Sequence, residues 1–204
     1  MKKFVFIVGL FLCTSWVIGQ SNNPVEARDN KLEEIRAKNG VKSMTITSYR
    51  ITNSGLSSEG RSITVHFGMD GVKIEKNEDL DDDESENGSD PKFKTNYDAA
   101  KKTYTTQLLG NDNRPKYVHV YKLDGASRII ELQVTDYARS IRYSKKYEYD
   151  KNGNEVESAK YTTSGRLIQK TVKAYYKNNL PQGRMIYEPG DNIKLVSFYE
   201  YEFY

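Results

Sequence analysis

The sequence predicts an all-β protein, an antiparallel meander of consecutive β-hairpins that form a curved open sheet, with a short N-terminal helix. Two observations support this fold class. Turn residues recur about every twelve to fourteen positions in the C-terminal half, near Gly125, Arg139, Gly153, Gly165, Asn178 and Gly190. The runs between these turns are rich in tyrosine, of which the chain has 16. Strands of usual length joined by tight turns produce this spacing.

Residues 1–19 have the pattern of a signal peptide. Lys2 and Lys3 precede an apolar run, and a short Val-Ile-Gly motif at residues 17–19 suits signal peptidase. We therefore expect cleavage before Gln20 and export of the mature chain to the periplasm, the cell surface or the extracellular space. Lipid attachment at Cys13 is not expected, because bulky Leu12 precedes it. An uncleaved membrane anchor is the open alternative.

Cleavage changes the composition of the mature chain. It removes Cys13 and Trp16, the single cysteine and the single tryptophan, so the exported protein folds without a disulfide. It also removes Lys2 and Lys3, which leaves 29 basic residues against 28 acidic ones. This balance excludes a general nucleic-acid-binding surface. The remaining length is enough for a single domain with its own core.

Residues 20–40 predict a short helical lead-in. Pro24 suits the first turn of a helix, good helix formers follow it, and the Asn-Gly pair at residues 39–40 is a stop signal. Val25, Leu32 and Ile35 would form a narrow apolar face that packs against the sheet. Because three apolar residues bury little area, a disordered leader is the alternative.

Residues 41–204 predict one β-hairpin domain. Residues 43–52 and 61–67 alternate in polarity, and turn residues follow each run. An acidic loop at residues 77–91 then interrupts the pattern, because its carboxylates repel one another and few apolar residues offset them.

The acidic loop also raises the question of calcium. Asp83, Ser85 and Asn87 resemble the first half of an EF-hand loop, but Lys94 stands where that loop has its bidentate glutamate. The sequence therefore predicts no metal site and leaves calcium binding at these three residues as the alternative.

The C-terminal runs predict amphipathic strands. In residues 128–135, Ile130, Leu132 and Val134 share one face. Lys145 shares a face with Tyr147 and its tyrosine neighbours, and Lys173 shares one with Tyr175. Charges at these positions are costly against lipid, so no membrane span is expected after signal cleavage.

A tyrosine- and glycine-containing motif recurs in this region. Residues 147–154 read Tyr-Glu-Tyr-Asp-Lys-Asn-Gly-Asn, residues 161–167 contain a shortened copy, and weaker copies occur at 96–98, 121–125 and 187–193. On these residues the chain resembles the YD-repeat (RHS-like) family of secreted bacterial proteins. The resemblance implies a string of β-hairpins and supplies no catalytic residues. The turn residues of the repeat would be Asp150, Gly153, Gly165, Gly125 and Gly190.

The sequence contains no catalytic motif. His66 and His119 lie in strand patterns without closely spaced ligands, and no nucleophile or phosphate-loop motif is present. We expect no catalytic, cofactor-binding or metal-binding residues and no cofactor.

An aromatic stripe at the C-terminus is the predicted binding surface. Tyr199, Tyr201 and Phe203 share a strand face and could contact a protein or glycan partner at the cell envelope. The sequence thus predicts a secreted, non-enzymatic binding or structural module built of YD-like hairpins. The alternative is a surface glycan-binding or glycan-cleaving protein that uses tyrosine platforms and a carboxylate pair.

Overall fold

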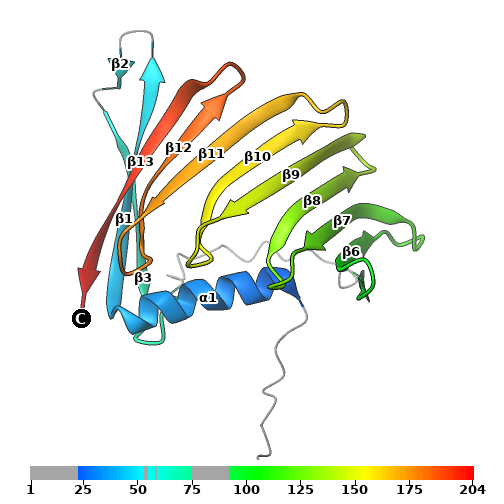
Figure 1. Cartoon of the computed structure of the whole chain (residues 1–204), viewed down its shortest axis with the longest axis horizontal. Coiled ribbons are helices and arrows are strands. Elements are labelled where there is room, and N and C mark those ends of the chain that lie inside the picture. Colours follow the sequence, from blue (N-terminus) through cyan, green and yellow to red (C-terminus); the bar gives the residue numbers. More distant parts are fainter. Residues whose placement is uncertain (1–22, 53–54, 58, 75–91) are drawn as a thin grey trace, which may run out of the picture.

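The computed structural model describes residues 23–52, 55–57, 59–74 and 92–204. The predicted signal peptide, the acidic loop, and Asp83, Ser85 and Asn87 within it lie outside these residues. The described elements are one helix and thirteen strands (Figure 1): α1 Pro24–Lys38, β1 Val41–Thr52, β2 Gly55–Leu56, β3 Arg61–Phe67, β4 Lys73–Ile74, β5 Lys92–Asp98, β6 Thr103–Leu109, β7 Pro115–Leu123, β8 Ile129–Asp136, β9 Ile141–Tyr149, β10 Glu155–Thr162, β11 Leu167–Tyr175, β12 Pro181–Glu188 and β13 Asn192–Phe203.

The helix begins and ends close to where the sequence predicts. The Asn23 side chain caps its first turn by accepting a hydrogen bond from the Val25 amide, and Pro24 occupies the first helical position. Val25 and Ile35 each pack against a buried cluster of the sheet, as expected. Leu32 is 37% exposed, so the apolar face of α1 is narrower than predicted.

An antiparallel open sheet preceded by a helix is confirmed. The strands from β5 to β13 each pair with the next, and β1 then pairs with β13 in the order β4-β3-β1-β13-β12-β11-β10-β9-β8-β7-β6-β5. The sequence did not predict the junction of the first strand with the last, in which Ser43 lies opposite Glu202. Because of this junction, β4 and β5 are the strands at the two opposite edges of the sheet.

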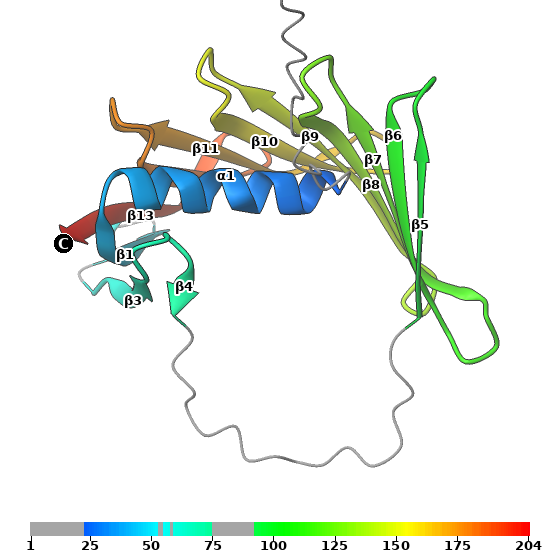
Figure 2. The ribbon, with the colours of Figure 1, turned by 90° about the horizontal axis from the view of Figure 1, so that it is seen from below.

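The sheet curves around α1, and the face that packs against the helix is called the inner face here (Figure 2). Two buried clusters lie on this side. One contains Tyr104, Tyr121, Leu123, Ile129 and Tyr147, with Val25 packed against it. The other contains Val41, Phe67 and Leu180, with Ile35 packed against it. The helix therefore touches the core near both of its ends.

A 26-residue repeat underlies the turn spacing. Tyr149, Tyr175 and Tyr201 are 26 residues apart, and each hydroxyl donates to a backbone carbonyl 20 residues earlier in the chain, on Ile129 (2.7 Å), Glu155 (2.9 Å) and Pro181 (2.7 Å) respectively. Each 26-residue repeat is one hairpin of two strands. The spacing of about thirteen residues between turns is therefore half of the repeat. The repeated bonds join the paired strands β8 and β9, β10 and β11, and β12 and β13 along one edge of the inner face.

Candidate functional site

The helix lies along a row of hairpin ends (Figure 1). Lys31 Nζ donates to the carbonyl of Gly153 (2.6 Å) and to that of Asn152 (3.2 Å), in the turn between β9 and β10. Asn39 Nδ2 donates to the carbonyl of Asn178 (3.3 Å), in the turn between β11 and β12. Eight helical residues rise about 12 Å, close to the ~10 Å that separates successive hairpins. The distance along the helix between Lys31 and Asn39 is therefore close to the spacing of the hairpins. Polar contacts from these two residues hold α1 against two successive turns of the edge.

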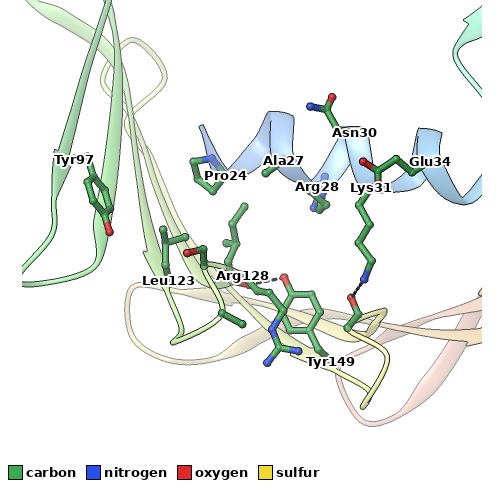
Figure 3. Close-up of a pocket in the computed structure, with 14 residues that line it drawn as sticks. Pro24, Ala27, Arg28, Asn30, Lys31, Glu34, Tyr97, Leu123, Arg128 and Tyr149 are labelled. Atoms are coloured by element: carbon green, nitrogen blue, oxygen red, sulfur yellow. Dashed lines mark hydrogen bonds between the residues drawn. The ribbon is translucent and has the colours of Figure 1, made fainter. Parts of the chain in front are cut away.

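A cavity of about 490 Å³ lies between the N-terminal part of α1 and these hairpin ends (Figure 3). Its volume is within the usual range for small-molecule sites. The helix supplies one wall and the β7–β8 and β9–β10 hairpins supply the other. The lining residues are Pro24, Ala27, Arg28, Asn30, Lys31, Glu34, Tyr97, Leu123, Ala126, Ser127, Arg128, Ile129, Tyr149 and Gly153.

The floor of the cavity is apolar. Leu123 and Ile129 are buried and belong to the larger aromatic and aliphatic cluster, against which Tyr149 also packs. The Tyr149 hydroxyl donates to the Ile129 carbonyl at 2.7 Å, which fixes its ring at this position. Burial raises the pKa of Tyr149 to about 12, so the phenol is neutral at physiological pH.

The rim of the cavity is charged. Arg128 binds Asp124 through two nitrogens, at 2.6 and 2.7 Å, and its guanidinium lies 4.8 Å from the centre of the Tyr149 ring. Burial opposes ionisation of Asp124, but hydrogen bonds from Arg128 and Ala126 outweigh it and lower the carboxyl pKa. This pair is therefore charged at neutral pH, and its Arg128 lines the cavity.

A second charged group extends from the cavity onto the sheet. Arg28 on α1 lies 3.6 Å from Glu155, and Lys173 on β11 lies 2.8 Å from the same carboxylate. The Glu155 side chain is only 9% exposed. Since Arg28 also lines the cavity, this charged group borders it on the side of the inner face.

The predicted turn residues occupy two different edges. Asp150 accepts hydrogen bonds from the Asn152 and Asn154 amides, each at 2.8 Å, and Gly153 has φ 76°, as its Asp-x-x-Gly pattern predicts. Gly153 lines the cavity. Gly165 (φ 80°) and Gly190 (φ 86°) lie in turns at the other ends of the strands.

Gly125 lies in the β7–β8 turn, but positive φ in this turn belongs to Ser127, at 60°. The turn hydrogen bond from the Ser127 amide to the Asp124 carbonyl matches the bond from Gly153 to Asp150. The same turn geometry therefore accepts a serine where the motif has glycine.

The predicted aromatic stripe is divided between interior and surface. β13 pairs with both β1 and β12, so it is a central strand of the sheet. Tyr201 packs against the cluster of Val41, Phe67 and Leu180, and burial raises the pKa of its phenol and of the Tyr199 phenol. Phe203 is 53% exposed. Whether these three residues bind a partner stays a prediction.

The two histidines lie on different strands, His66 on β3 and His119 on β7. The His119 ring stands beside Tyr121, with 3.3 Å between its Nδ1 and the phenol oxygen, and burial lowers its pKa. Within the described ranges, no group of three or more His, Cys, Asp or Glu residues could hold a metal ion.

Most of the residues around the cavity belong to no sequence motif. Arg28 and Lys31 lie in the helix, and Leu123 and Ile129 lie at strand ends, with no local pattern that marks them as a site. One signal was present: Lys145 and Lys173 share strand faces with tyrosines, which is unusual for the buried side of a sheet. That pattern marks the polar region of the inner face.

No helix in the described part of the chain is long and apolar enough to cross a membrane. Comparisons with known proteins gave limited matches. No family model and no curated protein matches the chain.

Solved structures do match, at low similarity. A DUF1329 family protein from Desulfovibrio piger has 12% identity and a TM-score of 0.34, over 87% of this chain and 92% of that one. A LolA superfamily protein from Nitrosomonas europaea has 9% identity and a TM-score of 0.34, over 85% and 91%. A putative outer membrane lipoprotein-sorting protein domain from Vibrio parahaemolyticus has 6% identity and a TM-score of 0.28, over 88% and 94%.

These findings correct the family assignment. The YD-repeat resemblance is wrong, since no family model, that of the YD repeat included, matches the chain. The function derived from it, a YD-repeat module or a glycan-binding surface protein, is wrong with it. The physical reason is that residues 147–154 encode a hairpin end: Asp150 caps the turn, Gly153 supplies positive φ and Tyr149 ties β9 to the neighbouring β8. Any hairpin of this geometry can carry that pattern.

Proposed function

We propose that this chain is an exported, non-enzymatic binding protein that holds an acyl-chain ligand, such as a single-chain lipid, between α1 and the inner face. The carrying observation is the cavity of about 490 Å³, with its apolar floor, under a helix that polar contacts hold in place. Ligand sites of this kind combine an apolar chamber with a few fixed polar groups.

The floor suits a hydrocarbon chain. Leu123, Ile129 and the Tyr149 ring face the cavity and continue into the buried cluster beneath it. An acyl chain laid on this floor would remove apolar surface from water on both partners, at roughly 25 cal/mol per Å². The hydroxyl of Tyr149 is already bonded to Ile129, so its ring remains available for apolar contact.

The helix suits a reversible cover. Of the fifteen residues of α1, only Pro24 is buried. An isolated helix of this length is marginal in water, and most helical stability comes from packing of an apolar face. A ligand that fills the space between α1 and the sheet would add apolar packing to the contacts that Pro24, Val25 and Ile35 already make.

Export fits this role. The predicted signal peptide at residues 1–19 would send the chain to a compartment bounded by membranes, where lipids and lipid-modified molecules need carriers to cross aqueous space.

A binding experiment tests the proposal. Dansyl-labelled undecanoic acid should bind the mature protein with a blue shift and a rise in emission. Ala27→Trp places a large ring where Ala27 lines the cavity, so it should weaken binding of the probe at least tenfold. Ala174→Trp is the matched control, because Ala174 is an exposed residue of β11 outside the cavity lining. No binding by the parent protein, or equal binding by the two variants, would contradict the proposal.

A further inference from the structure

Two pairs of like charges face one another across neighbouring strands. Lys145 on β9 is directly opposite Lys160 on β10, and Lys173 on β11 is directly opposite Arg184 on β12. Like charges in this arrangement destabilise a sheet. They lie on the inner face: Lys173 contacts Glu155 beside α1, and Lys145 is on the strand face of the buried Tyr147. Such an arrangement is costly without a partner that uses it.

The protein neutralises this cluster only in part. Glu155 forms salt bridges with Lys173 and Arg28. Lys145 and Lys160 form no salt bridge with any carboxylate of the described residues. Their ammonium groups lie instead over tyrosine rings, Lys145 at 5.3 Å from the centre of Tyr147 and Lys160 at 3.9 Å from that of Tyr143.

The environment of Lys145 disfavours an extra positive charge. Burial lowers the pKa of its ammonium; Glu155 opposes this effect, while Lys173, Arg28 and Lys160 add to it. An anion placed among these groups would relieve all of these costs together.

The outer face of the same strands is arranged differently. Lys146 follows Lys145 in the chain, points to the other face, and lies opposite Glu131 on β8. Lys170 forms a salt bridge with Asp191 at 3.2 Å. Lys146 and Lys170 also lie over tyrosine rings, 5.6 Å from the centre of Tyr161 and 5.0 Å from that of Tyr187. The two faces therefore differ in their acidic partners: the outer lysines have an acidic residue opposite or bonded to them, whereas Lys145 and Lys160 form no salt bridge in the described part of the chain. This asymmetry makes the inner face selectively attractive to anions.

Arg28 connects this cluster to the cavity. It lines the cavity from α1 and reaches Glu155 on the sheet. We infer that Lys145, Lys160, Lys173 and Arg184, with Arg28, bind the phosphate group of a single-chain phospholipid whose acyl chain lies in the cavity. Phosphate oxygens accept several charge-assisted hydrogen bonds at once, and these bonds are strongest where water is partly excluded. The inference rests on the proposed function and specifies the chemical class of its ligand.

Two lipids that differ only in the phosphate test the inference. Lysophosphatidic acid and the monoacylglycerol with the same chain are titrated by calorimetry against the mature protein, below the concentrations at which they form micelles. We expect lysophosphatidic acid to bind at least tenfold more tightly than the monoacylglycerol. A tenfold ratio corresponds to the free energy of about one charge-assisted hydrogen bond. Its affinity should fall as ionic strength rises, because salt screens charges at a partly open site.

Two double variants with equal changes in charge locate the site. Lys145→Gln with Lys160→Gln should remove the preference for lysophosphatidic acid and leave monoacylglycerol affinity within twofold. Its melting temperature without ligand should stay the same or rise, because a repulsive pair is removed. Lys146→Gln with Lys170→Gln, on the outer face, should keep the preference.

The outcomes separate the two claims. Equal affinity for both lipids, or loss of preference in the outer variant, overturns the phosphate site and leaves the proposed function standing. Absence of binding by either lipid overturns the proposed function as well. Inorganic phosphate is titrated separately. If it binds saturably through Lys145 and Lys160 while neither lipid binds, the site recognises free phosphate, and the inference that the phosphate belongs to a lipid is wrong.

Discussion

Gly153 and Gly165 lie in the turns at the two ends of β10 and have almost the same backbone conformation, with φ 76° and 80°. Their surroundings differ. A Cβ built at Gly165 would have no neighbour within 4 Å, whereas one at Gly153 would lie 3.0 Å from Lys31 Nζ. The carbonyl of Gly153 also accepts a hydrogen bond from that amine. Turns with the same glycine conformation therefore lie at both ends of β10. The turn at Gly165 has free space around its glycine, whereas the turn at Gly153 contacts the helix.

The same contrast extends along the sheet. At the edge beside α1, Tyr149, Tyr175 and Tyr201 each tie their strand to an earlier one through a carbonyl. At the other edge, Tyr137 is 55% exposed. The difference teaches that the hairpin repeat builds the sheet, and that the additional contacts of one edge build the cavity.

The largest expected effect separates the two edges directly. Tyr175→Ala removes a half-buried ring and the hydrogen bond to the Glu155 carbonyl, so we expect a loss of about 3 kcal/mol in the free energy of unfolding. Tyr137→Ala should change it by less than about 0.5 kcal/mol. Urea denaturation followed by circular dichroism measures both. Similar losses in the two variants would show that the edges are equally important for stability.

A smaller effect isolates the contact between helix and turn. Gly153→Ala and Gly165→Ala should each cost about 1–2 kcal/mol, because both force a side chain into the left-handed region. Gly153→Ala should cost about 0.5–1 kcal/mol more, since it displaces the Lys31 amine from the Gly153 carbonyl. Denaturant midpoints of the two variants and of the parent give the comparison. An excess at Gly165 instead would mean that Lys31 does not hold the helix.

The smallest effect concerns the phenol hydroxyls at the edge beside α1. Burial raises the pKa of Tyr147 and of Tyr149 to about 12, against about 10 in the unfolded chain. Since the folded state holds these protons more tightly, the stabilisation is complete below pH 10 and is lost as pH rises from 10 through 12.

Tyr149→Phe tests this assignment. It should cost about 1 kcal/mol at pH 7 through the lost bond to Ile129, and it should reduce the fall in melting temperature between pH 10 and 12. Tyr137→Phe serves as the exposed control. Thermal melts at a series of pH values measure both, and an alkaline fall of the same size in Tyr149→Phe as in the parent would contradict the assignment.

Local sequence patterns predicted most of the secondary structure. The amphipathic run at residues 128–135 coincides with β8 to within one residue, and the helix at residues 24–38 ends beside the predicted Asn-Gly stop. Alternation shows which residues share a face, but it does not show which distant strand will pair with them. The register of Ser43 with Glu202 therefore could not be predicted.

The site escaped prediction for a related reason. Arg28, Lys145, Lys173 and Glu155 are far apart in the chain, and only the strand registers and the position of α1 bring them together. Their spacing matches no short motif. The tyrosines at positions 149, 175 and 201 did carry a detectable signal, because their 26-residue period is twice the turn spacing.

The central claim, that an acyl chain lies between α1 and the inner face, is tested most directly by locating a bound chain. Stearic acid with a nitroxide near its methyl end is added to protein with labelled methyl groups, and paramagnetic broadening is measured by NMR. The account predicts strong broadening of the Leu123 and Ile129 methyl signals and no specific broadening of Val196, which lies on β13 outside the cavity lining. Broadening centred on Val196, or equal weak broadening of all three, would contradict it.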